Sequence, residues 1–335
     1  MTRVFSGIKP TGHMTLGNYL GAVRQWAEVD QYRGEALFSV VDLHALTVEH
    51  EPARVLRLSR QVATLLLAAG LDPAVCTLFV QSHVDEHVRL SYLLECTATD
   101  GEMRRMIQYR EKGARARAAG ESVRLSLLTY PVLMAADILA YGADEVPVGD
   151  DQTQHVELTR DLAVRFNQRY GQTFVVPRAV KPEVAARVMD LQDPASKMGK
   201  TTAGTGGVVF LLDEPEVVRK KVMRAVTDSG SGVEYDPVGR PGVANLLEIL
   251  AACGGGDGSG PAVLAEGYAT YGALKRDVAD AVVEVLRPVR ERHAELAADA
   301  GYVDGVLREG AERARGMARG RVDGAYRAVG LMGRG

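Results

Sequence analysis

The first half of the chain alternates short apolar runs with helical segments, and this alternation limits the possible folds more than any other feature. The runs 36–41 (ALFSVV) and 76–81 (CTLFVQ) have almost no polar interruption. Between them, residues 52–70 carry apolar side chains at helical spacing and end at a glycine. Continuous apolar strands are typical of parallel sheets with both faces covered by helices. The strand–helix–strand order therefore predicts an α/β fold with a doubly wound parallel sheet.

The same patterns divide the chain into an α/β part and a helical part. Strands are predicted at 3–8, 36–41, 76–81, 145–148, 174–176 and 187–189. Helices are predicted at 16–29, 52–70, 87–109, 122–141, 152–170, 213–227, 243–252, 271–299 and 303–328. The segments 110–121 (small and basic) and 199–207 (Gly/Thr-rich) have few apolar anchors, so we expect loops at both. The second loop marks the expected boundary between the two parts.

Composition excludes several classes of protein. The 335 residues are 46% hydrophobic and 25% charged, which is typical of a folded protein and suits two domains. We find no apolar secretion signal and no apolar run near the ~18 residues that span a bilayer, so we expect a cytoplasmic protein without a membrane partner. Cys76, Cys96 and Cys253 lack C-x-x-C spacing, which argues against zinc and disulfides and predicts buried free thiols.

The net charge of −3 means that any nucleic-acid binding must rest on a local patch. Residues 102–124 form such a patch, because seven Lys and Arg face only three Glu there. We expect this segment to contact phosphates.

Three short polar segments lie where an α/β sheet places its ligands, near the ends of predicted strands. They are 10–18 (PTGHMTLGN), 147–155 (PVGDDQTQH) and 197–201 (KMGKT). A glycine before a helix start suits a phosphate in the first, and two lysines suit a polyphosphate in the last. Taken singly, these two are better explained by a capped turn and by a solvated basic loop.

Taken together, the three segments resemble the class I aminoacyl-tRNA synthetases. Residues 15–18 (TLGN) resemble the HIGH signature in its tryptophanyl form, and 197–201 resemble the KMSKS loop. Longer matches indicate the bacterial type of tryptophanyl-tRNA synthetase over nearly the whole chain. They lie at 5–12 (FSGIKPTG), 41–47 (VDLHALT), 128–139 (LTYPVLMAADIL), 146–152 (VPVGDDQ), 225–229 (AVTDS) and 242–247 (GVANLL).

The resemblance implies three regions. Residues 1–207 would form a Rossmann-like catalytic domain that ends in the KMSKS-like loop, about 193–207, and residues 208–300 an all-helical domain that binds the anticodon. Residues 301–335 would form a C-terminal helix that packs back on the catalytic domain. Family members are homodimers, and the resemblance implies that 76–135 carry most of the dimer contact.

For tryptophan, the resemblance implies a pocket in which Asp137 accepts the indole N–H. Burying that donor without an acceptor costs about 1–3 kcal/mol, so we expect Asp137→Ala to abolish activation and leave the fold intact. Tyr130 and Gln152 match positions that hold the ammonium and carboxylate, and His44 matches a position beside the pocket. The tryptophan-binding residues implied are Phe5, Gly7, His44, Tyr130, Met134, Asp137, Val146, Val148 and Gln152.

For ATP, the resemblance implies contacts from all three polar segments and from the basic segment. The ATP-binding residues implied are Lys9, Thr15, Gly17, Asn18, Gln108, Gly149, Asp151, Val188, Met189, Lys197, Met198 and Lys200. The catalytic group implied is Thr15, Asn18, Lys112, Lys197 and Lys200. Mg²⁺ is expected on the phosphates, held by oxygens of ATP and water, so no metal-ligating residue is predicted.

The implied reaction has two steps and needs no protein nucleophile. The carboxylate of tryptophan attacks the α-phosphorus of ATP and releases pyrophosphate, and the 2′-hydroxyl of the terminal adenosine of tRNA(Trp) then attacks the adenylate and releases AMP. Catalysis would rest on positioning and charge stabilisation. The implied partners are L-tryptophan, tRNA(Trp) and a second copy of the chain, with no role for DNA.

Three other functions share parts of these patterns. A tyrosyl-tRNA synthetase normally has Gly-Gly before the Asp-Gln where this chain has 148–152 (VGDDQ). A non-catalytic paralogue is opposed by the charged and small residues kept in both signature segments. A nicotinamide dehydrogenase would need a G-x-G-x-x-G after the first strand, and none follows it.

Two residues depart from the family pattern. Lys9 stands where a glutamine is usual, and Gly199 replaces the serine of KMSKS. These departures suggest a divergent or auxiliary form, and we hypothesise that Lys9 makes the enzyme tolerant of indole-type inhibitors.

Overall fold

The computed structural model describes residues 2–27, 35–149, 152–180, 187–199, 205–254 and 258–332. Five parallel strands form one sheet in the order β3-β2-β1-β4-β5, which confirms the predicted doubly wound parallel sheet. The strands are β1 (Val4–Ile8), β2 (Ala36–Val40), β3 (Cys76–Val80), β4 (Glu145–Pro147) and β5 (Arg178–Val180). The chain starts at the central strand and fills one side of the sheet before the other, so the order reverses between β1 and β4.

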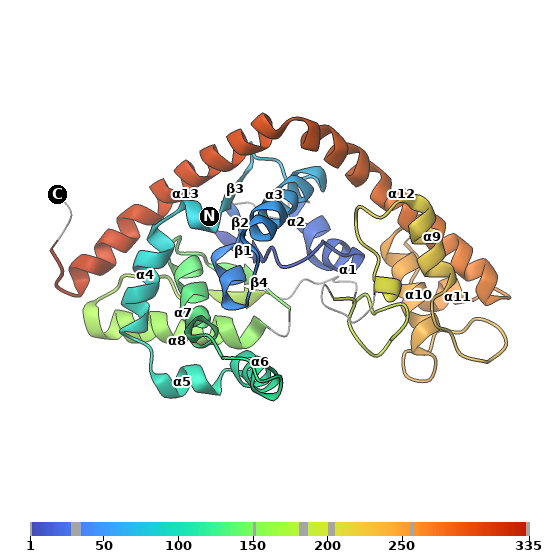
Figure 1. The fold of residues 1–335 in the computed structure, drawn as a ribbon, viewed down its shortest axis with the longest axis horizontal. Helices are drawn as coiled ribbons and strands as arrows, with labels where there is room; N and C mark the ends of the chain where they lie inside the picture. Colours follow the sequence, from blue (N-terminus) through green and yellow to red (C-terminus); the bar gives the residue numbers. More distant parts are fainter. Residues whose placement is uncertain are drawn as a thin grey trace.

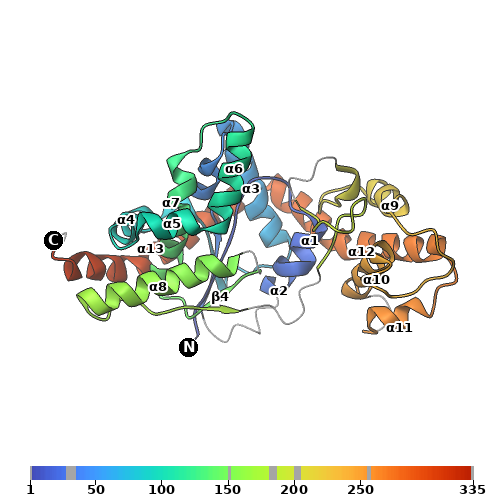
Figure 2. The same cartoon turned by 90° about the horizontal axis from the view of Figure 1, so that it is seen from below.

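Helices of the α/β part cover both faces of the sheet (Figure 2). Successive residues of a strand point to opposite faces, and in β2 Leu37 and Phe38 belong to separate hydrophobic clusters. The cluster around Phe38 includes α3, and the cluster around Leu37 includes α4, α7 and α8. The helices of this part are α1 (Leu16–Asn18), α2 (Arg24–Ala27), α3 (Pro52–Ala68), α4 (Glu86–Glu95), α5 (Asp100–Arg105), α6 (Ile107–Ala118), α7 (Leu125–Leu139) and α8 (Thr153–Tyr170).

A second, helical part follows, and the last helix returns from it to the sheet (Figure 1). This helix, α13, approaches β3 so closely that a Cβ added at Gly310 would lie 1.8 Å from the carbonyl oxygen of Leu78. Only a glycine allows that contact. The helices are α9 (Pro215–Met223), α10 (Pro241–Ala252), α11 (Pro261–Ala265), α12 (Tyr271–Ala298) and α13 (Ala300–Ala328).

Two predictions about the basic segment were wrong. The segment 110–121 is not a loop, because residues 107–118 form α6. Its Ala, Arg, Lys and Glu are strong helix formers, and helix formation did not require apolar anchors. The predicted helix 87–109 is broken into three, because Thr99 starts α5 with a capping box to Glu102 and a non-helical Met106 separates α5 from α6.

Two short strands were also misplaced. Residues 174–176 carry no strand, and the strand that pairs with β4 is β5, at 178–180. Met189 forms one isolated antiparallel bridge with Lys197, and no strand spans 187–189. Each run was too short for its apolar pattern to fix the register.

The predictions for the cysteines and for the loop 199–207 were only partly confirmed. Cys76 is buried as predicted, but Cys96 is exposed and Cys253 is half-buried. In the predicted loop 199–207, residues 205–207 form a 3₁₀ turn, and 200–204 lie outside the described residues. Across the described ranges, we find no helix that is both long and apolar enough to cross a bilayer.

Candidate active site

A cavity of about 360 Å³ lies at the carboxyl ends of β1 and β4. The strand order reverses between these neighbours, which is where open α/β sheets bind ligands, and the volume suits a small molecule. All nine residues predicted to bind tryptophan line this one cavity: Phe5, Gly7, His44, Tyr130, Met134, Asp137, Val146, Val148 and Gln152. Four residues predicted for ATP or catalysis also line it: Lys9, Gln108, Lys112 and Gly149.

Aromatic and branched apolar side chains form one wall of the cavity. The ring of Phe5 stacks on that of Tyr141, with centroids 5.6 Å apart, and the lining continues with Val146 on the neighbouring strand and Val148 just after it. Gly7 leaves space that a larger residue would fill, since a Cβ there would lie 2.9 Å from Cγ1 of Val41. An aromatic ligand could therefore bury its faces here.

One face of α7 supplies the polar end of the cavity. Tyr130, Met134 and Asp137 are spaced four and three residues apart, which places them on the same side of a helix. The hydroxyl of Tyr130 lies 2.7 Å from Nε2 of His155 on α8. The spacing thus brings a hydroxyl, a thioether and a carboxylate into one pocket.

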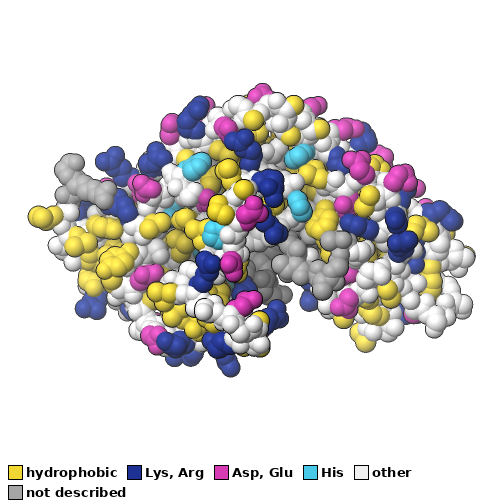
Figure 3. Space-filling model, viewed as in Figure 1, with side chains coloured by type: hydrophobic (Ala, Val, Ile, Leu, Met, Phe, Trp, Pro, Cys, Tyr) yellow, Lys and Arg dark blue, Asp and Glu magenta, His cyan; other side chains and the backbone are white. Residues whose placement is uncertain are grey.

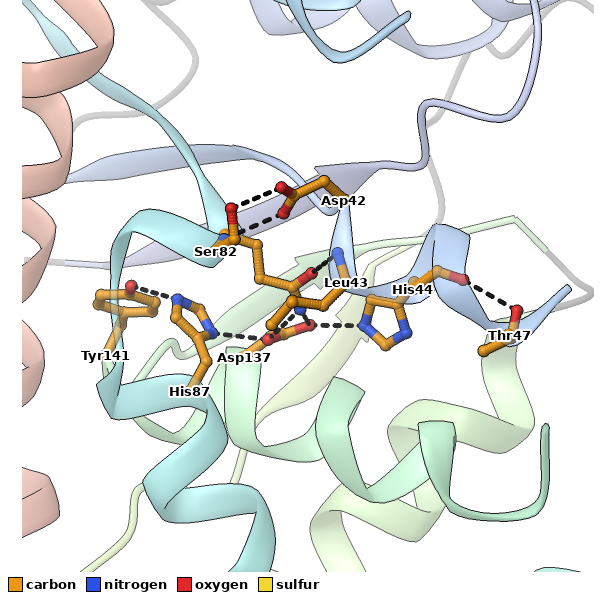
Figure 4. Close-up of polar contacts among 9 residues, drawn as sticks. Asp42, Leu43, His44, Thr47, Ser82, His87, Asp137 and Tyr141 are labelled. Carbon is orange, nitrogen blue, oxygen red and sulfur yellow. Dashed lines mark hydrogen bonds and ion pairs between the residues drawn. The ribbon is translucent and has the colours of Figure 1, made fainter. Parts of the chain in front are cut away.

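The carboxylate of Asp137 is 1% exposed and accepts hydrogen bonds on both oxygens (Figure 4). Oδ1 lies 2.6 Å from Nδ1 of His87 and 2.8 Å from Nε2 of Gln81. Oδ2 lies 2.8 Å from Nε2 of His44 and 2.9 Å from the same Gln81 nitrogen. Burial by itself would raise the pKa of Asp137, but the nearby imidazoles of His87 and His44 outweigh it and lower the pKa to about 2. The carboxylate is therefore ionised at neutral pH and acts only as an acceptor.

Three residues of this network were not predicted from the sequence. Gln81 and His87 are fully buried, and Tyr141, also buried, pairs its hydroxyl with Nε2 of His87 at 2.7 Å. The available signal was a polar side chain inside or beside an apolar run, as at the end of β3 for Gln81. Such a residue must find a partner when the run is buried.

The turn that follows β2 is tied to the turn that follows β3. The backbone N–H of Leu43 donates to Oε1 of Gln81 at 3.0 Å, and Asp42 accepts from the backbone and the hydroxyl of Ser82 (Figure 4). These bonds hold the 3₁₀ turn Leu43–Thr47, and with it His44, against the cavity. The segment 41–47 thus places His44 beside Val41 and Thr47 in the cavity lining.

Lys9 reaches the same turn from β1. Its ammonium donates to Oγ1 of Thr47 at 3.1 Å, and that hydroxyl donates to the carbonyl oxygen of His44 at 2.9 Å. Gln108 and Lys112 approach the cavity from α6, and Lys112 is exposed. Two lysines, Lys9 and Lys112, therefore belong to the cavity lining, where an anionic ligand group would be stabilised.

The other residues predicted for ATP form a second group, beside the helical part. The segment Met14–Leu16 hydrogen-bonds through its backbone with residues 209–211. A Cβ at Gly17 would lie 3.5 Å from both Val188 and Met198, so these residues are packed together. This second group, which does not line the cavity, consists of Thr15, Gly17, Asn18, Val188, Met189, Lys197 and Met198. Asp151 and Lys200 lie outside the described residues.

The geometry changes the interpretation of Thr15. Its side chain is completely buried, and its hydroxyl accepts from the backbone N–H of Asn18 and donates to Oδ1 of Asn18. This capping box starts α1. In this conformation the Thr15 hydroxyl is paired within the turn, and its predicted role towards ATP stays a prediction.

Asn245 on α10 connects the helical part to this second group. Its Oδ1 accepts from the backbone N–H of Met189 at 2.8 Å, and its Nδ2 donates to the carbonyl oxygen of Met189 at 3.0 Å. Asn245 is 3% exposed. One amide therefore fixes both backbone groups of a residue predicted to read the adenine.

The comparisons with known proteins agree with this geometry. The model of the family described as tRNA synthetases class I (W and Y) matches residues 1–287. Tryptophan–tRNA ligase 1 of Streptomyces coelicolor is 77% identical over 332 residues, which cover 99% of this chain and 98% of the relative.

Two solved structures are similar over almost their whole length. The crystal structure of tryptophanyl-tRNA synthetase from Mycoplasma pneumoniae has a TM-score of 0.90 and 34% identity, and the match covers 99% of this chain and 98% of that one. The synthetase from Campylobacter jejuni, solved with ADP and tryptophan, has a TM-score of 0.84 and 29% identity, and the match covers 98% and 100%.

Proposed function

The chain belongs to the class I tRNA synthetases of the tryptophan and tyrosine group, and from this premise we propose that the cavity between β1 and β4 binds L-tryptophan. The chain is an enzyme that activates tryptophan with ATP and charges tRNA(Trp), since relatives that are 75–77% identical are tryptophan–tRNA ligases. The observation that carries the pocket assignment is the convergence of nine predicted residues on one cavity with an ionised Asp137 at its end.

In the proposed complex, Asp137 accepts the indole N–H, and Phe5, Val146 and Val148 cover the ring. The amino-acid end lies towards Tyr130 and Gln152. The carboxylate of tryptophan is then directed to the open side of the cavity, where Lys9 and Lys112 lie. There it attacks the α-phosphorus of ATP in line, pyrophosphate leaves, and the protein contributes positioning and charge stabilisation.

ATP is proposed to lie between the cavity and the second group of residues. The backbone of Val188, Met189 and Met198 would contact the adenine, while Gly17 allows close approach to the α1 turn. Lys197 is exposed at the start of the KMSKS-like loop, and with Lys200 it would stabilise the polyphosphate. We propose that Mg²⁺ arrives with ATP, held by phosphate oxygens and water; in the described part of the chain, no three His, Cys, Asp or Glu side chains are grouped to hold a metal.

Three surfaces are proposed for macromolecular partners. Lys and Arg side chains of α5 and α6 gather along one edge of the molecule, where the acceptor end of tRNA(Trp) would lie (Figure 3). The helical region 208–300 is proposed to hold the anticodon. Exposed Val88 and Tyr92 lie four residues apart on α4, and Leu125 is 74% exposed, which supports a homodimer contact within 76–135. Charging tRNA for translation would occur in the cytoplasm.

The tyrosyl and non-catalytic alternatives are not favoured, because the high-identity relatives are tryptophan–tRNA ligases. Amino-acid-dependent pyrophosphate exchange, followed by aminoacylation of tRNA(Trp), tests the proposal. We expect exchange with tryptophan alone among the twenty amino acids. Exchange with tyrosine at a similar efficiency would contradict the assignment of the pocket.

A further inference from the structure

Asp137 is hydrogen-bonded to a network of buried polar residues that does not line the cavity. His87 contacts Oδ1 of Asp137, and Tyr141 contacts the far nitrogen of the same imidazole (Figure 4). Gln81 donates to both carboxylate oxygens. None of these three residues is among those that line the cavity, whereas Asp137 and His44 are.

The surroundings of this polar network are apolar, so its presence needs an explanation. The ring of His87 packs against Phe79 and Tyr141, within the cluster that also contains Leu90 and Leu139. A set of buried polar groups contributes less stability than apolar residues of the same volume unless every group is paired. Here each group is paired, and the pairing ends at one carboxylate.

We propose that Gln81, His87 and Tyr141 are positioning residues for tryptophan recognition, and that they hold the Asp137 carboxylate with Oδ2 on the pocket side. This inference rests on the proposed role of Asp137 as the acceptor of the indole N–H. Oδ2 is the oxygen next to the pocket-lining His44, while Oδ1 is committed to His87.

The positioning residues restrict the carboxylate in different ways, Gln81 directly and Tyr141 through His87. Gln81 bonds both oxygens, and its own Oε1 is anchored by the backbone N–H of Leu43, so it restricts rotation of the carboxylate plane. Tyr141 restricts His87, because an imidazole whose far nitrogen is bonded cannot turn away from Asp137. Burial raises the pKa of Tyr141 well above 10, so its hydroxyl keeps its proton at neutral pH.

In this arrangement the positioning residues fix the carboxylate, and the carboxylate accepts the indole N–H. An exposed aspartate would adopt several rotamers, and each tryptophan bound would bear the entropy of fixing it. A carboxylate that is fixed in advance places its acceptor where the indole N–H arrives. Loss of the fixing residues should therefore weaken recognition of the N–H selectively.

The test compares tryptophan with 3-(benzothiophen-3-yl)alanine, in which sulfur replaces the indole N–H. The measured quantity is the ratio of kcat/KM for the two amino acids in pyrophosphate exchange. Tyr141→Phe keeps the ring that stacks on Phe5 and removes only the hydroxyl. We expect it to lower kcat/KM for tryptophan roughly tenfold, equivalent to about 1.4 kcal/mol, and to change the analogue less than about threefold.

Two substitutions of His87 should lower the ratio of kcat/KM values by different amounts. His87→Leu removes the donor to Asp137 and should lower the ratio further, whereas His87→Asn keeps an amide donor near the Nδ1 position and should restore part of it. Tyr326→Phe is the matched control, because it removes a tyrosine hydroxyl that donates to the carbonyl oxygen of Arg89 outside this network. The control should keep the wild-type ratio.

Asp137→Asn, measured in parallel, distinguishes a failure of the positioning role from a failure of the pocket assignment. If it abolishes the preference for tryptophan while Tyr141→Phe and His87→Leu keep the wild-type ratio, the positioning role is wrong and the pocket assignment stands. If Asp137→Asn itself keeps the ratio, the pocket assignment fails. Equal losses for both amino acids in Tyr141→Phe would also overturn the positioning role, since they would reflect a general change in the core.

Discussion

Nε2 of His44 lies 2.8 Å from Oδ2 of Asp137, so the oxygen assigned to the indole N–H is also bonded by a residue of the protein. An ionised carboxylate has about four acceptor positions, and Asp137 accepts four hydrogen bonds from His44, Gln81 and His87. An indole N–H that reaches Oδ2 therefore competes with the donors of His44 and Gln81, of which only His44 lines the cavity.

Replacement of His44 by alanine is expected to increase the preference for tryptophan over the benzothiophene analogue. In the wild type, tryptophan exchanges one hydrogen bond of Asp137 for another, whereas in His44→Ala it makes a bond that is otherwise missing. A net hydrogen bond to a charged group contributes about 1.5–3 kcal/mol, so the ratio of kcat/KM values should rise roughly tenfold or more. His50→Ala is the control, because His50 contacts a nearby backbone carbonyl. A lower ratio in His44→Ala would mean that His44 and the indole share the oxygen.

Asp137→Ala is expected to destabilise the protein as well as abolish tryptophan activation. From the sequence we expected an intact fold, but the structure leaves three buried donors, on His44, Gln81 and His87, without an acceptor in this variant. The free energy of unfolding should fall by about 3 kcal/mol. Denaturant unfolding at pH 7 gives this value, and a loss below about 0.5 kcal/mol would contradict the network.

The pH dependence of Asp137→Asn checks the same network from another side. The pKa of Asp137 is lowered to about 2, below its usual value near 4, so its ionised form stabilises the folded state above pH 4. This stabilisation is lost as the pH falls through 2. The difference in unfolding free energy between wild type and Asp137→Asn should thus shrink as the pH falls below 4. A difference that grows below pH 4 has the wrong sign.

Substitution of Lys197 is expected to act on the rate of adenylate formation. The exposed ammonium of Lys197 would meet phosphate oxygens chiefly in the transition state, so Lys197→Ala should lower kcat roughly 10²-fold and change the Kd of tryptophan little. Single-turnover adenylate formation and equilibrium binding separate the two effects. Lys200→Ala is predicted to behave in the same way, and a collapse of tryptophan affinity would assign the loop another role.

Asn245→Ala is expected to raise the KM for ATP several-fold and leave the KM for tryptophan unchanged. The amide of Asn245 fixes both backbone groups of Met189, which lies in the second group and not beside the cavity. Asn167→Ala is the matched control, since Asn167 bonds backbone groups of Phe174 in the same way at a distant site. An equal rise of the ATP KM in both variants would indicate lost stability and not lost positioning.

The sequence predicted the parts of the molecule in which one local pattern dominates. β1, β2 and β3 were predicted to within one residue at either end, and β2 and β3 are buried along their whole length, as expected for strands covered on both faces. The nine pocket residues followed from the family resemblance, and their convergence could not be derived from any one segment. Gln81, His87 and Tyr141 were missed because their partners lie far away along the chain. The contacts of Gln81 with Asp137 and of Tyr141 with His87 each join residues more than fifty positions apart. Such pairing is a property of the fold.

Lys9 offers the most specific test of the departures from the family pattern. Its ammonium donates to Thr47, whose hydroxyl in turn bonds the backbone of His44, so Lys9 is connected to the turn that faces the pocket. A lysine offers only donors there, whereas the glutamine usual in the family would offer an amide oxygen as well. We predict that Lys9→Gln increases the affinity for indole-type inhibitors that lack the natural ammonium and carboxylate, with a near-normal KM for tryptophan.

The reason for this asymmetry is the number of anchors that each ligand has. Tryptophan can be held at its amino-acid end by groups such as Tyr130 and Gln152, so the loss of one amide acceptor near Lys9 changes its affinity little. An inhibitor without those groups depends on fewer polar contacts, and one additional hydrogen bond of about 1 kcal/mol lowers its inhibition constant roughly fivefold. Inhibition constants for wild type and Lys9→Gln, measured side by side with Lys9→Met as a variant that lacks both donor and acceptor, decide the matter. Equal constants in all three would show that Lys9 is neutral variation, whereas tighter inhibition in Lys9→Gln alone would make the missing amide the cause of tolerance.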